Sequence, residues 1–266
     1  MAMEPILNLE PIVKHFQAFF LVLARTSGIF AASPFFGSMD IPIQVKAALS
    51  LLLSLVIFPV VGLGVGERIP ENVMLYGIFV LQEVMVGLII GFITSLIFTA
   101  FQLSGQFYSL QIGFGIVSVM DPMSQTEIPI IGQLVGLLAL LVFILFGGHH
   151  LTIKALCESY TLVPVLHLRS ASSLVMHITD LVAAMFLIAM KIGLPIIGTV
   201  FLTDVSFGIL SRAAPQMNIM MIGWPVKILV GLITLIVFIP LLHQAMVNVF
   251  ANLFSDLNVI MRAMGK

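Results

Sequence analysis

The chain has 266 residues, of which 60% are hydrophobic and 9% are charged, whereas soluble domains have about 45–50% apolar and about 25% charged residues. This excess excludes a water-soluble globular protein, because a domain of this size needs a polar surface. Eleven Lys and Arg against twelve Asp and Glu give a formal net charge of −1, so no basic field is available to bind nucleic acid.

The first apolar run, residues 16–32, predicts a retained helix and not a cleaved signal peptide. Glu4 and Glu10 precede Lys14, which is the wrong charge for a signal peptide, and Arg25 interrupts the run. We therefore expect the first span to remain in the mature protein.

A bilayer core of about 30 Å requires about 20 apolar residues in a helix. Six runs meet or approach this length, at residues 16–32, 47–66, 84–120, 128–153, 181–203 and 228–255. No linker of low complexity separates them. The sequence predicts an all-α integral membrane protein with about six hydrophobic helices, organised as a single membrane domain over residues 1–266.

The run over residues 84–120 is too long for one span and becomes rich in glycine and amides after Gln102. Irregular backbone exposed to hydrocarbon costs several kcal/mol per unsatisfied group, so this part should face protein or water. We predict a helix over residues 73–103, a re-entrant or loop segment over about 112–127, and a new helix from Ile128. Pro122 and Pro129 disfavour helix at the end of the loop segment.

Three charges lie within or at the start of apolar runs, where an ionised group must be paired, protonated or hydrated. Glu83 fits either a proton or ion relay, or a carboxylate at the membrane interface near a helix start. Arg25 and Lys191 fit snorkelling, an interhelical ion pair or a substrate contact.

No residue pattern indicates catalysis, a cofactor or a metal. His149 and His150 are adjacent and point about 100° apart on a helix, which does not suit a metal site. The single Cys157 excludes an intrachain disulfide. No Ser/His/Asp arrangement or phosphate-binding loop is present, so we expect a protein that is not an enzyme.

Three glycine pairs, 62/66, 87/91 and 132/136, have the spacing that lets helices approach closely. They predict close helix packing without identifying the partner helix.

The glycine and amide segment carries a specific signature. Its members are Ser104-Gly105-Gln106, Gln111-Ile112-Gly113-Phe114, Asp121-Pro122 and Pro129. Further landmarks are Arg25 with Pro34, Val45-Lys46, residues 87–92, Gly147-Gly148-His149 and residues 212–218. Over nearly its whole length the chain resembles the FliR family, the flagellar members of the T-type subunit of type III secretion export gates.

The resemblance implies a non-enzymatic subunit of the inner-membrane export gate in the flagellar basal body. Its partners would be FliP-type and FliQ-type subunits, FlhB-type and FlhA-type components, lipid and unfolded protein substrates. The family is built from helical hairpins, so spans counted from hydropathy need not cross the bilayer.

The resemblance also implies a loop that projects into the gate and plugs it at rest. The residues of this plug would be Ile112, Gly113, Phe114, Gly115, Ile116, Val117, Ser118, Val119, Met120, Asp121 and Pro122. A separate set of buried polar residues is expected to support packing; its members are Arg25, Glu83, Lys191 and Arg212. Apolar bulk in a narrow lumen excludes water and ions by dewetting. Without the resemblance, the residues favour a loop packed permanently between helices over a plug. A secondary transporter of a small solute or ion is the alternative function.

Overall fold

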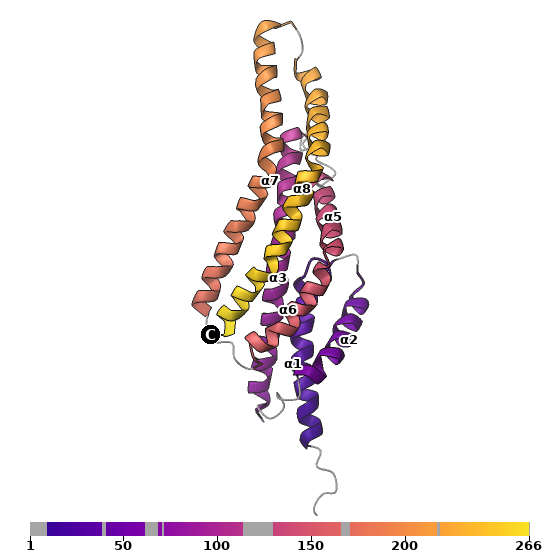
Figure 1. Cartoon of the computed structure of the whole chain (residues 1–266), viewed down its shortest axis with the longest axis vertical. Coiled ribbons are helices and arrows are strands. Elements are labelled where there is room, and N and C mark those ends of the chain that lie inside the picture. The colour runs from indigo at the N-terminus through magenta and orange to yellow at the C-terminus, as the bar shows by residue number, and fades with distance from the viewer. Residues whose placement is uncertain are drawn as a thin grey trace, which may run out of the picture. The chain divides into compact units, whose positions relative to one another are not determined.

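The computed structural model describes residues 10–38, 41–61, 69–70, 72–113, 130–165, 171–216 and 219–265. All regular secondary structure within these ranges is α-helical. The helices are α1 (Glu10–Ala32), α2 (Ile43–Val61), α3 (Val73–Ile112), α5 (Ile130–Leu145), α6 (Gly148–Leu162), α7 (Ala171–Ala213) and α8 (Ile219–Gly265) (Figure 1).

Five of these helices, α1, α2, α3, α7 and α8, are long and apolar enough to cross a membrane. The pair α5 and α6 adds a sixth candidate if the two bent helices are counted as one span. The predicted class, an all-α membrane protein with about six hydrophobic helices, is confirmed.

The third helix is longer than predicted, because α3 continues to Ile112 and does not end near Leu103. Ser104 and Gly105 are buried, and the Ser104 hydroxyl donates a hydrogen bond to the Phe101 carbonyl. Ser104 and Gly105 therefore face protein from within a regular helix, whereas Gln102 and Gln106 are exposed on the same helix.

The run predicted over residues 128–153 is divided in the structure by a sharp turn. Helix α5 ends at Leu145, and α6 begins at Gly148 with a bend of 68° between the two. Gly147 has a φ of 74°, a left-handed conformation that glycine adopts without a steric penalty. Gly147 and Gly148 thus redirect the chain from one helix into the next.

The chain falls into two compact units, each built from segments distant in sequence. The first contains residues 1–95, 149–178 and 253–266, which include α1, α2, the first half of α3 and nearly all of α6. Helix α1 packs against α2 through Phe19 and Phe58, which are partly buried and whose ring centroids lie 5.7 Å apart. Leu21, Val22 and Ile90 are fully or almost fully buried in the same unit.

The second unit contains residues 96–148 and 179–252, which include the end of α3, α5 and most of α7 and α8. Its core holds four phenylalanines that contact one another with ring centroids 5.2–5.6 Å apart; they are Phe98, Phe101, Phe143 and Phe250.

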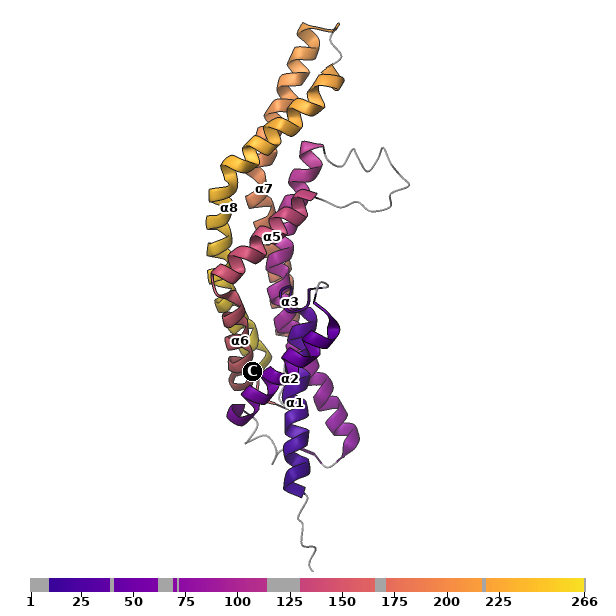
Figure 2. The same cartoon turned by 90° about the vertical axis from the view of Figure 1, so that its right-hand side faces the viewer.

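Helices α3 and α5 cross closely in this second unit (Figure 2). A Cβ at Gly105 would lie 2.6 Å from the Gly132 Cα, and one at Gly136 would lie 2.9 Å from the Gln102 side chain. One of the glycine pairs noted in the sequence thus lies at a helix crossing, where the absence of side chains lets the two backbones approach.

Candidate functional site

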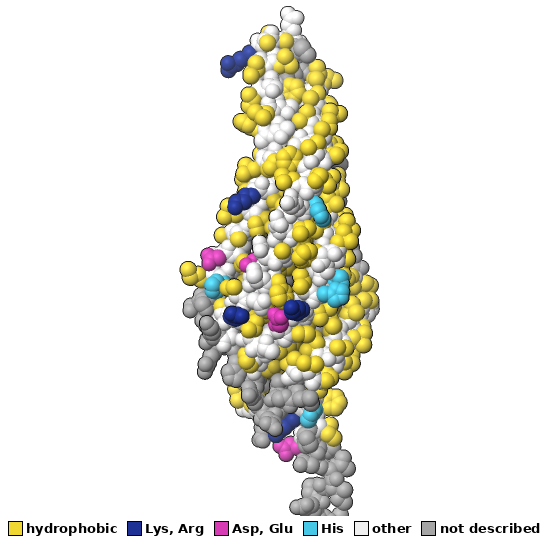
Figure 3. Space-filling view, in the orientation of Figure 1, with side chains coloured by type: hydrophobic (Ala, Val, Ile, Leu, Met, Phe, Trp, Pro, Cys, Tyr) yellow, Lys and Arg dark blue, Asp and Glu magenta, His cyan; other side chains and the backbone are white. Residues whose placement is uncertain are grey.

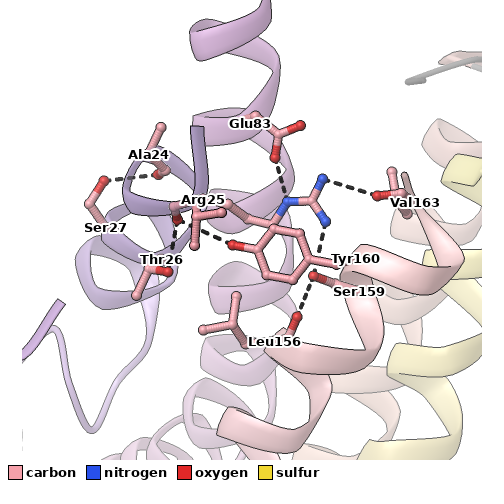
Figure 4. A network of polar contacts seen from close by, with 10 residues as sticks. Ala24, Arg25, Thr26, Ser27, Glu83, Leu156, Ser159, Tyr160 and Val163 are labelled. Carbon is pink, nitrogen blue, oxygen red and sulfur yellow. Dashed lines mark hydrogen bonds and ion pairs between the residues drawn. The ribbon is translucent and has the colours of Figure 1, made fainter. Parts of the chain in front are cut away.

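A buried ion pair links α1 to α3 in the first unit. The Arg25 side chain is fully buried and Glu83 is 2% exposed. The Arg25 Nε donates to Glu83 Oε2 at 2.6 Å (Figure 4). Of the alternatives that the sequence left open for Arg25, the structure gives the interhelical ion pair.

Helix α6 supplies the other contacts of the Arg25 guanidinium. Its Nη1 donates to the Ser159 hydroxyl at 3.1 Å, and its Nη2 donates to the Val163 carbonyl at 3.0 Å just beyond the helix end. The guanidinium carbon also lies 4.3 Å from the centre of the Tyr160 ring, within cation–π distance. One arginine thus holds α1, α3 and the end of α6 together (Figure 4).

Tyr160 on α6 makes a second contact between this cluster and α1. The Tyr160 hydroxyl donates to the Val22 carbonyl at 3.2 Å, about one helical turn before Arg25. Because Arg25 and Tyr160 both reach across the gap between α1 and α6, the two helices are joined by contacts in both directions.

Glycines near Arg25 and Glu83 let α1 and α3 approach closely enough for the two side chains to pair. Gly28 follows Arg25 by three residues, and Gly87 follows Glu83 by four, so each lies about one turn from its charge. A Cβ at Gly28 would lie 2.6 Å from the Val84 carbonyl oxygen, and one at Gly87 would collide with the Arg25 carbonyl. The close crossing brings the two side chains within bonding distance.

The geometry fits a structural clamp better than either interpretation of Glu83 drawn from the sequence. Glu83 is enclosed, so it does not lie at a hydrated interface. A proton relay needs groups that both accept and donate, whereas arginine only donates. The described hydrogen bonds of Arg25 all end on oxygens of α3, of α6 or of the residue just after α6, and so link these segments to α1.

Two of the four predicted buried polar residues are exposed, which corrects the expectation for Lys191 and Arg212. Lys191 is at the rim of a cavity of about 180 Å³ whose other walls are mostly apolar. Arg212 lies in the last turn of α7, where a cation is favoured by the helix dipole. Both side chains lie on faces of α7 that the rest of the chain does not cover.

Only the first two residues of the predicted plug segment belong to the described part of the chain. Ile112 ends α3 and is 1% exposed, and Gly113 follows with a φ of 103°. Ile112 is therefore anchored in the interior of the second unit. Phe114, Gly115, Ile116, Val117, Ser118, Val119, Met120, Asp121 and Pro122 lie outside the described residues, as does the rest of the segment to residue 127.

Sequence reasoning missed a second ion pair, in the second unit. The Lys227 Nζ on α8 donates to Asp204 Oδ2 on α7 at 2.8 Å. The available signal was a pair of opposite charges at the facing ends of two successive apolar runs, Asp204 just after residues 181–203 and Lys227 just before residues 228–255, and in a membrane protein such charges are expected to pair.

The described residues contain no group of three His, Cys, Asp or Glu side chains that could hold a metal ion. The His149 ring packs beside His150 and Phe35, at centroid distances of 4.1 and 6.2 Å.

Long apolar helices, close glycine crossings and a buried ion pair define an all-α membrane protein with polar contacts between its helices. The chain belongs to the bacterial export proteins, family 1, whose model matches residues 16–253. The resemblance drawn from the sequence is thereby confirmed.

Three relatives that share one name match most of the chain. The flagellar biosynthetic protein FliR of Bacillus subtilis (strain 168) is 30% identical over 97% of this chain and 99% of its own length. The protein of that name from Escherichia coli (strain K12) is 26% identical over 89% of this chain and 90% of its own, and that of Pectobacterium carotovorum subsp. carotovorum is 26% identical over 93% and 94%. These likenesses support a role in flagellar biosynthesis and export, at a membrane-associated flagellar location and together with other export components.

Proposed function

We propose that this chain is a non-enzymatic subunit of the inner-membrane flagellar type III export gate, where it helps to form and seal the conduit for unfolded flagellar proteins. The observation that carries the proposal is the match to an export family over residues 16–253, in a chain whose longest helices leave most of their apolar surface open. The whole chain, residues 1–266, would act as one membrane domain of the gate.

The longest helices with open apolar surface are α7 and α8. Of the 18-residue apolar stretch that qualifies each of them as a candidate span, only 22% is buried within the chain, whereas the corresponding share for α3 is 56%. Large apolar side chains cover much of the visible face of the α7–α8 pair (Figure 3). The most exposed of them include Leu187, Phe201, Leu202, Ile209, Ile236 and Val237.

Lipid alone does not account for this surface. Helices of 43 and 47 residues, α7 and α8, have contour lengths of about 65 and 70 Å, roughly twice the hydrocarbon core of a bilayer. Partner helices can cover the remainder, and contiguous exposed apolar patches mark such interaction sites. The partners would be FliP-type and FliQ-type subunits in the gate, next to FlhB-type and FlhA-type components, within the basal body.

The seal would come from the segment that follows α3. Its side chains between Phe114 and Met120 are mostly bulky and apolar, which suits a constriction that excludes water. The end of α3 supports this assignment, because Ile112 is anchored in the interior and Gly113 turns the backbone out of the helix.

Deleting residues 113–117 tests the seal. In gates assembled with their partner subunits, the deletion should raise the basal ion conductance of a planar bilayer while subunit co-purification is retained. Phe114→Asp should produce the same leak because it hydrates the constriction. The same substitution at Phe146, an exposed phenylalanine outside the segment, is the control and should leave conductance unchanged.

Unchanged conductance in both segment variants would refute the sealing role. Loss of assembly in both, with the control still assembling, would mean that the segment is packing and not a plug.

A further inference from the structure

Three helices of the second unit meet at the end of α3. Asp204 Oδ2 accepts the 2.8 Å hydrogen bond from Lys227 Nζ and a longer one, of 3.5 Å, from the side-chain nitrogen Nε2 of Gln111. Gln111 is the second-to-last residue of α3, and the two charges come from α7 and α8. The ion pair thus lies at the end of α3, with one charge on α7 and the other on α8.

The next residue of α3 makes an apolar contact with the same face of α8. A Cβ at Gly231 would lie 2.5 Å from a side-chain carbon of Ile112, so the isoleucine rests directly on the glycine backbone. Lys227 and Gly231 are four residues apart and share one helix face. Because Gly231 has no side chain, Ile112 fits against the backbone of α8 at this point. One turn away on α8, Lys227 binds Asp204 of α7.

The charges are costly at this place unless they are paired. The Lys227 side chain is 19% exposed and the Asp204 side chain 39%, and both lie in apolar helices where an unpaired ion is strongly disfavoured. The contact also joins α7 to α8 beyond their apolar packing. The Asp204–Lys227 pair also contacts the end of α3 through Gln111, which neutralising the two charges alone would not require.

We propose that Asp204 and Lys227 are positioning residues that hold the α7–α8 pair around the end of α3 and so fix the place of Ile112 and Gly113. Only the consequence for sealing rests on the proposed function; the positioning itself does not.

Cross-linking of Ile112→Cys with Gly231→Cys measures this positioning directly. The background is Cys157→Ser, which removes the single native cysteine, in the full chain co-assembled with its gate partners. Asp204→Asn and Lys227→Met should each slow disulfide formation by about three- to tenfold, the effect of losing a partly buried ion pair. Asp180→Asn, an exposed aspartate on α7, is the matched control and should not change the rate.

The charge-swapped variant Asp204→Lys/Lys227→Asp separates pairing from general damage. It should restore the cross-linking rate, and also assembly if the single variants lose it. Equal rates in the single variants and the control, or a swap as defective as the single variants, would overturn the proposal.

Conductance of the same gates distinguishes this inference from the proposed function. The deletion of residues 113–117 serves as the reference for an open leak, and both single variants should leak at a lower level. A leak in the deletion but none in the single variants would overturn the link from positioning to sealing and leave the proposed function intact. No leak in any of the three would refute the proposed function, while the cross-linking rates would still decide the positioning.

Discussion

Arg25 is an enclosed cation in a chain with few charges, and its burial is compensated by specific partners. Moving a charge from water into a protein interior costs several kcal/mol, and this cost is offset only by well-placed bonds. Glu83, the Ser159 hydroxyl and the Val163 carbonyl provide them from two other helices. The same arrangement makes the cluster sensitive, because removing one partner leaves the other charge buried without compensation.

Glu83→Ala should therefore destabilise the protein by about 3–5 kcal/mol, measured by denaturant unfolding of the purified complex in detergent. The double variant Arg25→Met/Glu83→Met should recover much of this loss, since no buried charge remains. Lys14→Ala breaks the exposed pair with Glu10 and should cost less than about 1 kcal/mol. An effect of Glu83→Ala as small as that of Lys14→Ala would contradict a buried structural clamp.

At the scale of the helices, glycines decide which elements approach closely. Gly28 and Gly87 bring α1 against α3 in the first unit, and Gly105 and Gly132 bring α3 against α5 in the second. Each crossing lets polar groups meet or backbones touch, because no side chain separates the axes. Gly77 on α3 is different, since a Cβ there would meet nothing within 4 Å.

This contrast predicts opposite effects of one substitution on one helix. Gly87→Ala should destabilise by about 1–3 kcal/mol through overpacking against the Arg25 backbone. Gly77→Ala should instead be neutral or stabilise by up to about 1 kcal/mol, because alanine favours helix over glycine. Thermal unfolding of the two variants in the same detergent tests the prediction, and equal shifts would show that the crossing tolerates a methyl group.

At the scale of the whole molecule, the balance between buried and exposed apolar surface points to assembly. Of the 18-residue apolar stretches that qualify α2, α7 and α8 as candidate spans, only 17%, 22% and 22% are buried within the chain. Soluble and self-contained proteins rarely expose contiguous apolar surface of this extent.

The chain should accordingly be polydisperse when purified alone in mild detergent and become monodisperse when co-expressed with FliP-type and FliQ-type subunits. Size-exclusion chromatography with light scattering measures both states. An isolated chain that stays monomeric and stable through the same procedure would count against an obligate role in the gate.

Several features of the fold could be predicted because they depend on local composition. The apolar runs gave the positions of the long helices, and Arg25 and Glu83 stood out as charges in such runs. The end of α3 was misplaced because Gly105 signals an interruption in isolation but serves a helix crossing in the structure. Lys191 and Arg212 were expected inside and are exposed, since depth along a helix does not reveal which way a side chain faces.

The sequence by itself determined the membrane class and the approximate spans, because the preference of apolar segments for a nonaqueous environment accumulates along the chain and needs no knowledge of neighbours. The export family was indicated separately, by the resemblance of the glycine and amide signature to the FliR family. Only the tertiary structure decided that Arg25 pairs with Glu83, 58 residues away, and that Asp204 pairs with Lys227. Such pairings depend on which helix faces meet and at what distance, and electrostatic and hydrogen-bond energies fall off steeply with distance and misalignment.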